Sequence, residues 1–178
     1  LSLQQKELVY YLSQAALCGR DIIFDQNFKH NLTIRRTLEA IYEHYNGDRT
    51  TPEFKEFEVY LKRVWFANGI HHHYSGDKFD PGFSAAYFAT LVNASAEGTF
   101  PLLEGESLEG LVNRLTPILF DPTVAPKRIS QDAGNDLILA SAGNYYEGVN
   151  QQEAEGFYNA MKDPADPRPI SYGLNSKL

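Results

Sequence analysis

The sequence predicts a mainly α-helical fold with, at most, a short strand at its carboxyl end. Apolar residues recur at the spacing of one helix face through most of residues 1–120, and a Ser, Thr or Asn precedes several of these stretches, as is typical of helix starts. Residues 121–178 are instead rich in Pro, Gly and Asn, apart from one further helical stretch. We therefore expect a single segment over residues 1–178. It has a helical core over 1–120 and a loop-rich part over 121–178 with one capped helix.

The first helix is expected in residues 1–20, "LSLQQKELVYYLSQAALCGR". Ser2 marks its start and is followed three residues later by Gln5, which is the pattern of a capping box. Gly19 is expected to weaken or end the helix, because glycine lowers helix stability. The apolar residues at helical spacing are Leu8, Leu12, Ala15 and Ala16.

Two longer helices are expected next. The first lies within residues 31–48, where a single apolar face is followed by a stop signal at residues 46–48. The second begins with Thr51 as its cap and Pro52 in its first turn, and should end near residues 68–69. Their apolar faces consist of Ile34, Leu38, Ile41 and Tyr45, and of Phe54, Phe57, Leu61, Val64 and Trp65.

Two more helices complete the expected core. Residues 83–94 have Ser84 as their cap, and residues 107–120 have Ser107. The second of these helices should kink or end before Pro117, because proline does not fit a helix interior. We therefore expect five helices in this part of the chain.

The loop-rich part is expected to contain one helix after its loops. Asn150 and Glu153 form another capping-box pattern, and the Asp-Pro pair at residues 163–164 should end that helix before a Pro-rich loop. The apolar run at residues 137–139 is expected to form one short element. Residues 170–178 are expected to be extended, with no partner strand left in the chain.

The charge of the chain argues against polyanionic partners. The net charge is −7, and no basic stretch is longer than the pair Arg35-Arg36, so we expect neither nucleic acid nor an anionic membrane as a partner. No apolar run approaches the roughly 18 residues of a membrane span. Cys18 is the only cysteine, which excludes an internal disulfide and a zinc site made of several cysteines. We expect a soluble protein.

Three consecutive histidines stand in the loop expected at residues 68–79. On an extended segment only His71 and His73 share a face, and a zinc site needs at least one or two further ligands. Those would have to come from distant residues, since the only other histidines are His30 and His44. The pattern therefore favours a structural or substrate-facing loop over a metal site.

Cys18 and the tyrosine loop at residues 145–147 can each be interpreted as either functional or structural. Cys18 is a nucleophile only if the fold brings a histidine beside it, and otherwise is a small buried residue. Tyr145 and Tyr146 lie with Glu147 on a glycine-flanked loop. That loop either forms the rim of a site for an amine or peptide, or packs at a domain boundary.

Four segments, in order along the chain, resemble the dipeptidyl peptidase III family of zinc-dependent exopeptidases, which release dipeptides from peptide N-termini. Residues 1–27 are similar to its opening helix, residues 60–81 to its aromatic helix and following turn, and residues 143–162 to its tyrosine loop and capped helix. Residues 170–178 fall where the first strand of the family's lower-lobe β-barrel begins. The residues that match are Leu12, Ser13, Ala15, Ala16 and Gly19 in the first segment, and Gly76, Asp77, Lys78, Phe79 and Pro81 in the second.

This resemblance implies a fold and a function. The chain would be the helical N-terminal part of the lower lobe of a two-lobed zinc peptidase of bacterial type. Its partners would be the remaining catalytic lobe and peptide substrates. The family's zinc ligands and catalytic glutamate lie beyond residue 178, so the resemblance implies no catalytic or metal-binding residue here and no catalysis by this chain alone. The residues expected to line the cleft are Asn68, His71, His73, Tyr145 and Tyr146.

Two expectations follow for the parent protein. The chain starts with Leu1 and has Met161 as its only methionine, so we expect it to be a piece of a longer protein. We expect the parent to be cytoplasmic, with the periplasm as the alternative. A different class of function stays open, namely a free-standing helical module that binds a ligand or a protein through its histidine and tyrosine loops.

Overall fold

A computed structural model describes residues 1–96, 98–168, 170 and 172–177. The prediction of a mainly α-helical fold is confirmed. Within these residues the regular elements are helices, and the only pairings of extended backbone are isolated bridges. The helices are α1 (Leu3–Cys18), α2 (Arg20–Asn27), α3 (Asn31–His44), α4 (Pro52–Ala67), α5 (Ala85–Asn93), α6 (Leu108–Phe120) and α7 (Gln151–Ala160).

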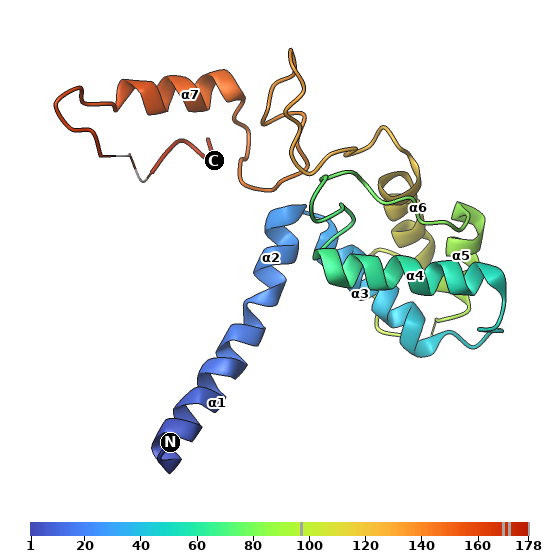
Figure 1. Ribbon diagram of the computed structural model, residues 1–178. Coiled ribbons are helices and arrows are strands. Elements are labelled where there is room, and N and C mark those ends of the chain that lie inside the picture. The colour runs from blue at the N-terminus through green and yellow to red at the C-terminus, as the bar shows by residue number, and fades with distance from the viewer. Residues whose placement is uncertain (97, 169, 171, 178) are drawn as a thin grey trace.

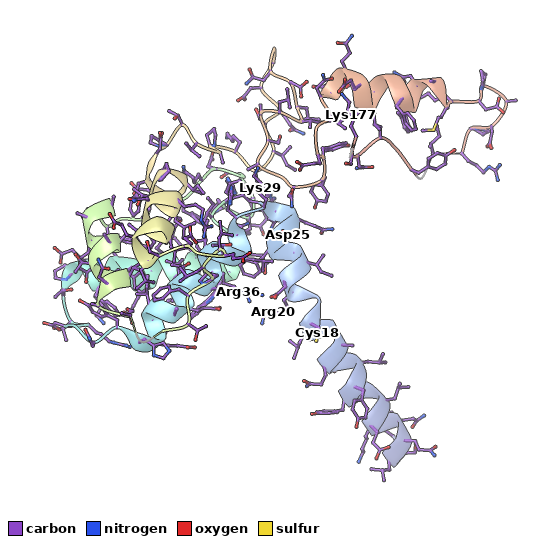
Figure 2. The ribbon with its side chains drawn as sticks, turned by 180° about the vertical axis from the view of Figure 1, so that it is seen from behind. Cys18, Arg20, Asp25, Lys29, Arg36 and Lys177 are labelled. Atoms are coloured by element: carbon purple, nitrogen blue, oxygen red, sulfur yellow. The ribbon has the colours of Figure 1, made fainter. Side chains whose placement is uncertain are left out.

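The helices divide into a packed group and two outlying ones. Within helices α2 to α6, α2 packs on α3, α3 packs on both α4 and α5, and α5 packs on α6. In Figure 1, α1 runs on from α2 as a stem that points away from this group, and α7 stands apart near the other end of α2. Cys18 ends the stem and Arg20 begins α2, while Asp25 and Lys29 lie where α2 meets the packed group (Figure 2).

The hydrophobic core lies between α3, α4, α5 and α6. Each of these helices turns one apolar face inward, as the spacing of their apolar residues predicts. The largest fully buried side chains are Tyr60, Phe54, Phe57, Phe88, Ile34, Leu38, Ile41, Leu61, Ile70, Leu91, Leu111 and Leu115. Trp65 was expected on the inward face of α4 but is 36% exposed, and its Nε1 donates a hydrogen bond to Glu39 Oε1 at 2.9 Å.

A buried asparagine connects the ends of α2 and α4. Asn31 is fully buried, its Nδ2 donates to the main-chain oxygen of Phe24 at 3.1 Å, and its Oδ1 accepts from the amide of Ile70 at 3.2 Å. Asn68 ends α4 in the left-handed conformation with φ 54°. Gly69 follows with φ 145°, and a Cβ at Gly69 would lie 2.1 Å from Asn31 Nδ2. Only glycine therefore lets the chain pass this close to Asn31.

The prediction that Gly19 ends the first helix is confirmed, because α1 stops at Cys18 and Gly19 is its C-terminal cap. The prediction of five helices before residue 121 was wrong, because the described residues contain six helices there. Gly19 keeps right-handed helical angles, φ −72° and ψ −9°, so a new helix, α2, begins directly after it. Phe24 is 2% exposed and attaches α2 to the core. Cys18 is exposed instead of buried, because α1 packs against none of the core helices.

Pro117 was expected to kink or end the last core helix, but α6 continues through it to Phe120. Proline removes one amide and therefore one hydrogen bond, and here it does so in the last turn, where few helical hydrogen bonds remain to be lost. The carbonyl of Pro117 still accepts from the amide of Asp121 at 3.1 Å.

The part after α6 is loop-rich and contains α7, with both hydrogen bonds of the predicted capping box at Asn150 and Glu153. The apolar run at residues 137–139 forms turns. The extended tail was expected to lack a partner, yet Ser176 forms a parallel bridge with Glu147 in the tyrosine loop. Residues 171 and 178 of the predicted extended segment lie outside the described residues. Among the helices of the described residues, none has the length and apolar character needed to cross a bilayer.

Candidate functional site

The histidine loop, residues 70–79, leaves α4 and folds back on itself. Its two ends are joined because the amide of Phe79 donates to the oxygen of Ile70 at 2.8 Å and the amide of His72 donates to the oxygen of Asp77 at 2.7 Å. Gly76 closes the turn with φ 71°, a conformation that suits glycine. Asp77 then forms an ion pair with Lys127 at 2.5 Å, and its pKa is lowered mainly by that ammonium group. The loop is thus held to the segment after α6.

His71 has a structural position. It is 2% exposed, and its Nε2 lies 2.8 Å from the main-chain oxygen of Ala125. Because a carbonyl only accepts, Nε2 must have the proton, and Nδ1 is then an unprotonated, buried atom with no hydrogen-bond partner among the described residues. The ring of Phe28 meets it edge to face at 5.7 Å. Burial lowers the pKa of His71, so the neutral ring is favoured.

His72 and His73 lie at the surface side of the loop. The Nδ1 of His72 accepts from the amides of Tyr74 and Ser75, both at 3.3 Å, so its proton is on Nε2. The two imidazoles stack with centroids 4.6 Å apart. The ring of His73 also contacts Phe66 edge to face at 4.9 Å.

A pocket of about 580 Å³ lies between these two histidines and the outer face of α4. We call it the α4 pocket, and its lining residues are Val59, Lys62, Arg63, Phe66, His72, His73 and Phe79. The four residues from α4 follow the i, i+3, i+4, i+7 spacing of one helix face. The sequence analysis missed Lys62, Arg63 and Phe66 as site residues, although this spacing could have indicated them.

Lys78 holds the end of α6 to the loop. Its ammonium group donates to the main-chain oxygens of Ile118 at 3.1 Å and Val124 at 2.7 Å, and also to that of Asp121. Ile118 lies in the last turn of α6, and Asp121 and Val124 follow the helix, so these carbonyls lie where regular helical hydrogen bonding ends. Burial lowers the pKa of Lys78. The cation therefore acts as a cap for the helix.

The remaining predicted site residues do not share the α4 pocket. The main-chain oxygen of Asn68 accepts from Asn27 Nδ2 at 3.0 Å, which ties it to α2. Tyr145 and Tyr146 are 52% and 39% exposed, and Tyr146 lines a separate pocket of about 590 Å³ together with Phe28 and other residues. The structure therefore brings Asn68 and His71 to the end of α4, and leaves the two tyrosines on another surface.

Within the described residues, no group of three or more His, Cys, Asp and Glu side chains is arranged to hold a metal ion. Compared with the models of known protein families and with curated proteins, the chain matches none of them.

Proposed function

We propose that the chain is the helical N-terminal part of the lower lobe of a dipeptidyl peptidase III-like zinc peptidase, which releases dipeptides from peptide N-termini. In this proposal the zinc and the catalytic glutamate belong to a later part of the same polypeptide, and the parent protein acts in the cytoplasm or, alternatively, in the periplasm. The proposal rests on the ordered resemblance of four segments and on one observation about α1.

That observation is that α1 has many apolar side chains and none of its residues is buried. All residues of α1 are exposed, although the helix has Leu, Val or Tyr side chains on every side. A helix that is apolar all round is normally buried inside a larger core. Its large exposed side chains are Leu3, Leu8, Val9, Tyr10, Tyr11, Leu12 and Leu17. Such a helix suits a part of a larger lobe better than a free-standing module.

A second surface supports the same proposal. No residue of α7 is buried, and Phe157 is 41% exposed. The backbone of the extended tail pairs with Glu147, through the amide of Glu147 to the oxygen of Asn175 at 2.8 Å and the amide of Lys177 to the oxygen of Glu147 at 3.3 Å. A tail that lies extended beside one loop offers an edge to which further strands could add.

Within this proposal the two loops have different tasks. The buried His71 fixes the end of α4 to the segment after α6 and so gives the wall of the cleft its shape. The exposed Tyr145 and Tyr146 are free to meet a peptide, through ring contacts and through hydroxyl groups that donate and accept. The residues present would thus shape and line the cleft, while the metal of the later segment would polarise the scissile carbonyl and activate water.

The experiment compares this 178-residue chain with the polypeptide encoded by the whole reading frame. The whole polypeptide should release dipeptides from a chromogenic dipeptidyl-arylamide, lose this activity to a chelator and regain it with zinc. The chain of residues 1–178 should show no turnover with added zinc. A reading frame that stops at Leu178, or chelator-sensitive turnover by the short chain that persists through purification, would overturn the proposal.

A further inference from the structure

We infer that the α4 pocket is a docking site for an acidic peptide segment with an aromatic or aliphatic side chain. This inference goes beyond the proposed function, because it concerns recognition of a partner segment and needs no zinc chemistry. It rests on the walls of the pocket, on the charges around it and on the hydrogen-bond donors that face it.

The walls are apolar and open to solvent. Phe66 is 71% exposed, lies outside the core cluster, and its ring meets that of His73 in a T-shaped contact. Val59, about two turns earlier on the same helix, is 39% exposed, and Phe79 closes the opposite side from the histidine loop. An aromatic or branched side chain placed here would be covered on several sides.

The charges at the pocket have one sign. Lys62 and Arg63 line it, and neither forms an ion pair with any described residue. The nearby carboxylates of Glu58 and Asp77 pair instead with Lys55 and Lys127. Among the described residues that line the pocket there is no carboxylate. In a chain of net charge −7 this is a local excess of positive charge. The complement of such a surface is an acidic segment.

The donors at the pocket are arranged around the apolar walls. The guanidinium carbon of Arg63 lies 6.0 Å from the centre of the Phe79 ring, which holds the cation beside the apolar wall. The proton of His72 is on Nε2, because its Nδ1 accepts two amides, so the ring offers a donor and not an acceptor. Carboxylate oxygens could accept from Lys62, Arg63 and His72 while an adjacent apolar side chain enters between Phe66 and Phe79.

Binding is measured by fluorescence anisotropy on the 178-residue chain. The probe is a fluorescein-labelled pentapeptide with a central phenylalanine and two glutamates on each side. Two matched peptides serve as controls, one with glutamines in place of the glutamates and one with glycine in place of the phenylalanine. We expect the acidic peptide to bind at least fivefold more tightly than either control, with affinity that falls as salt is added.

Variants then locate the site. Lys62→Ser and Arg63→Ser should each weaken binding about threefold, and the double variant about tenfold, as expected for exposed charge pairs. Phe66→Ser should weaken it through the loss of the apolar wall. The matched control is Lys6→Ser, which removes one exposed cation of α1 and should leave the affinity unchanged. Circular dichroism confirms that each variant is folded, and these exposed residues leave the core intact.

The outcomes separate this inference from the proposed function. Equal affinity for all three peptides, equal loss with Lys6→Ser, or no loss with Lys62→Ser and Arg63→Ser would overturn the docking site. Lys62→Glu combined with Arg63→Glu should reverse the preference toward a pentapeptide with lysines in place of the glutamates, and failure to do so would also overturn it. None of these results depends on dipeptidase activity of the whole polypeptide.

Discussion

His71 Nε2 lies 2.8 Å from the main-chain oxygen of Ala125, across 54 residues of sequence. This hydrogen bond joins the loop after α4 to the segment after α6, and Ala125 is held there with a positive φ of 48°. The two helices that enclose much of the core are thereby tied at their ends. We therefore expect the loss of this one hydrogen bond to lower the free energy of unfolding substantially.

Replacing His71 by Ala should lower the free energy of unfolding by about 3 kcal/mol, because it removes a buried ring and leaves the oxygen of Ala125 without its donor. Urea unfolding followed by circular dichroism measures the change. The matched control is His44→Ala, an exposed histidine, which should change stability by less than about 0.5 kcal/mol. A loss of similar size in both variants would contradict the structural role of His71.

The same histidine should make stability depend on pH. Burial lowers the pKa of His71 in the folded chain below the ordinary 6.5, and burial also lowers the pKa of His30. Both groups are neutral at pH 7.5, so their contribution is then fully present. As the pH falls below 6.5, these two histidines bind protons in the unfolded chain but stay neutral in the folded chain. The free energy of unfolding therefore declines until the pH has passed below their lowered pKa values in the folded chain. Unfolding curves between pH 7.5 and 5 test this, and His71→Phe should reduce the slope.

Lys78→Met should destabilise the chain by about 2 kcal/mol, because three main-chain oxygens at the end of α6 lose a charged donor. Methionine keeps most of the volume of the aliphatic part of the lysine side chain, so the loss of stability measures the contribution of the ammonium group. For comparison, Lys127→Met removes the exposed pair with Asp77 and should destabilise the chain much less than Lys78→Met. Equal effects would mean that the carbonyls at the end of α6 do not depend on Lys78.

Glu106 and Arg114 should account for part of the acid sensitivity. The guanidinium of Arg114 donates to both carboxylate oxygens, each at 2.7 Å, and this pairing lowers the pKa of Glu106 from 4.5 to about 2. The stabilisation is fully present above pH 4.5 and is lost as the pH falls toward 2. Glu106→Gln should therefore flatten the pH dependence of stability in this window. Glu104→Gln, on the same exposed loop, is the control and should leave the dependence as it is.

Removal of residues 1–18 should leave the core almost unchanged. No residue of α1 is buried, so its loss should alter the free energy of unfolding of the remaining chain by less than about 0.5 kcal/mol. Hydrogen exchange provides a second readout, because the amides of α1 should exchange much faster than those of α3 and α4. A marked destabilisation on truncation would show that α1 packs against the core.

Local sequence signals predicted most of the helices. Thr51 and Pro52 predict the start of α4, and Asn150 and Glu153 predict the start of α7. The capping hydrogen bonds in both helices are those expected from the residue types. Such signals work because they depend on residues three or four positions apart. The separate helix α2 after Gly19 was not predicted for the same reason, since Phe24 attaches α2 to a core formed by residues elsewhere in the chain.

The candidate site was less predictable than the helices. The spacing of Val59, Lys62, Arg63 and Phe66 already places them on one face of α4. Their meeting with Phe79 and the histidine pair depends on how residues 70–79 fold back, which no local spacing reveals. The burial of His71 likewise depends on Ala125, far along the chain. The division into a core over 1–120 and a loop-rich part over 121–178 stays a prediction.

The exposed stem also bears on how the chain becomes ordered during translation. Helices α2 to α6 pack mainly as chain neighbours, so this group can fold as soon as it has left the ribosome, with little loop closure to slow it. Helix α1 emerges before all of them and gains nothing from their folding. During synthesis the exposed apolar side chains of α1 would therefore lie beside an already folded group. Such a surface is the kind to which chaperones bind and through which chains self-associate.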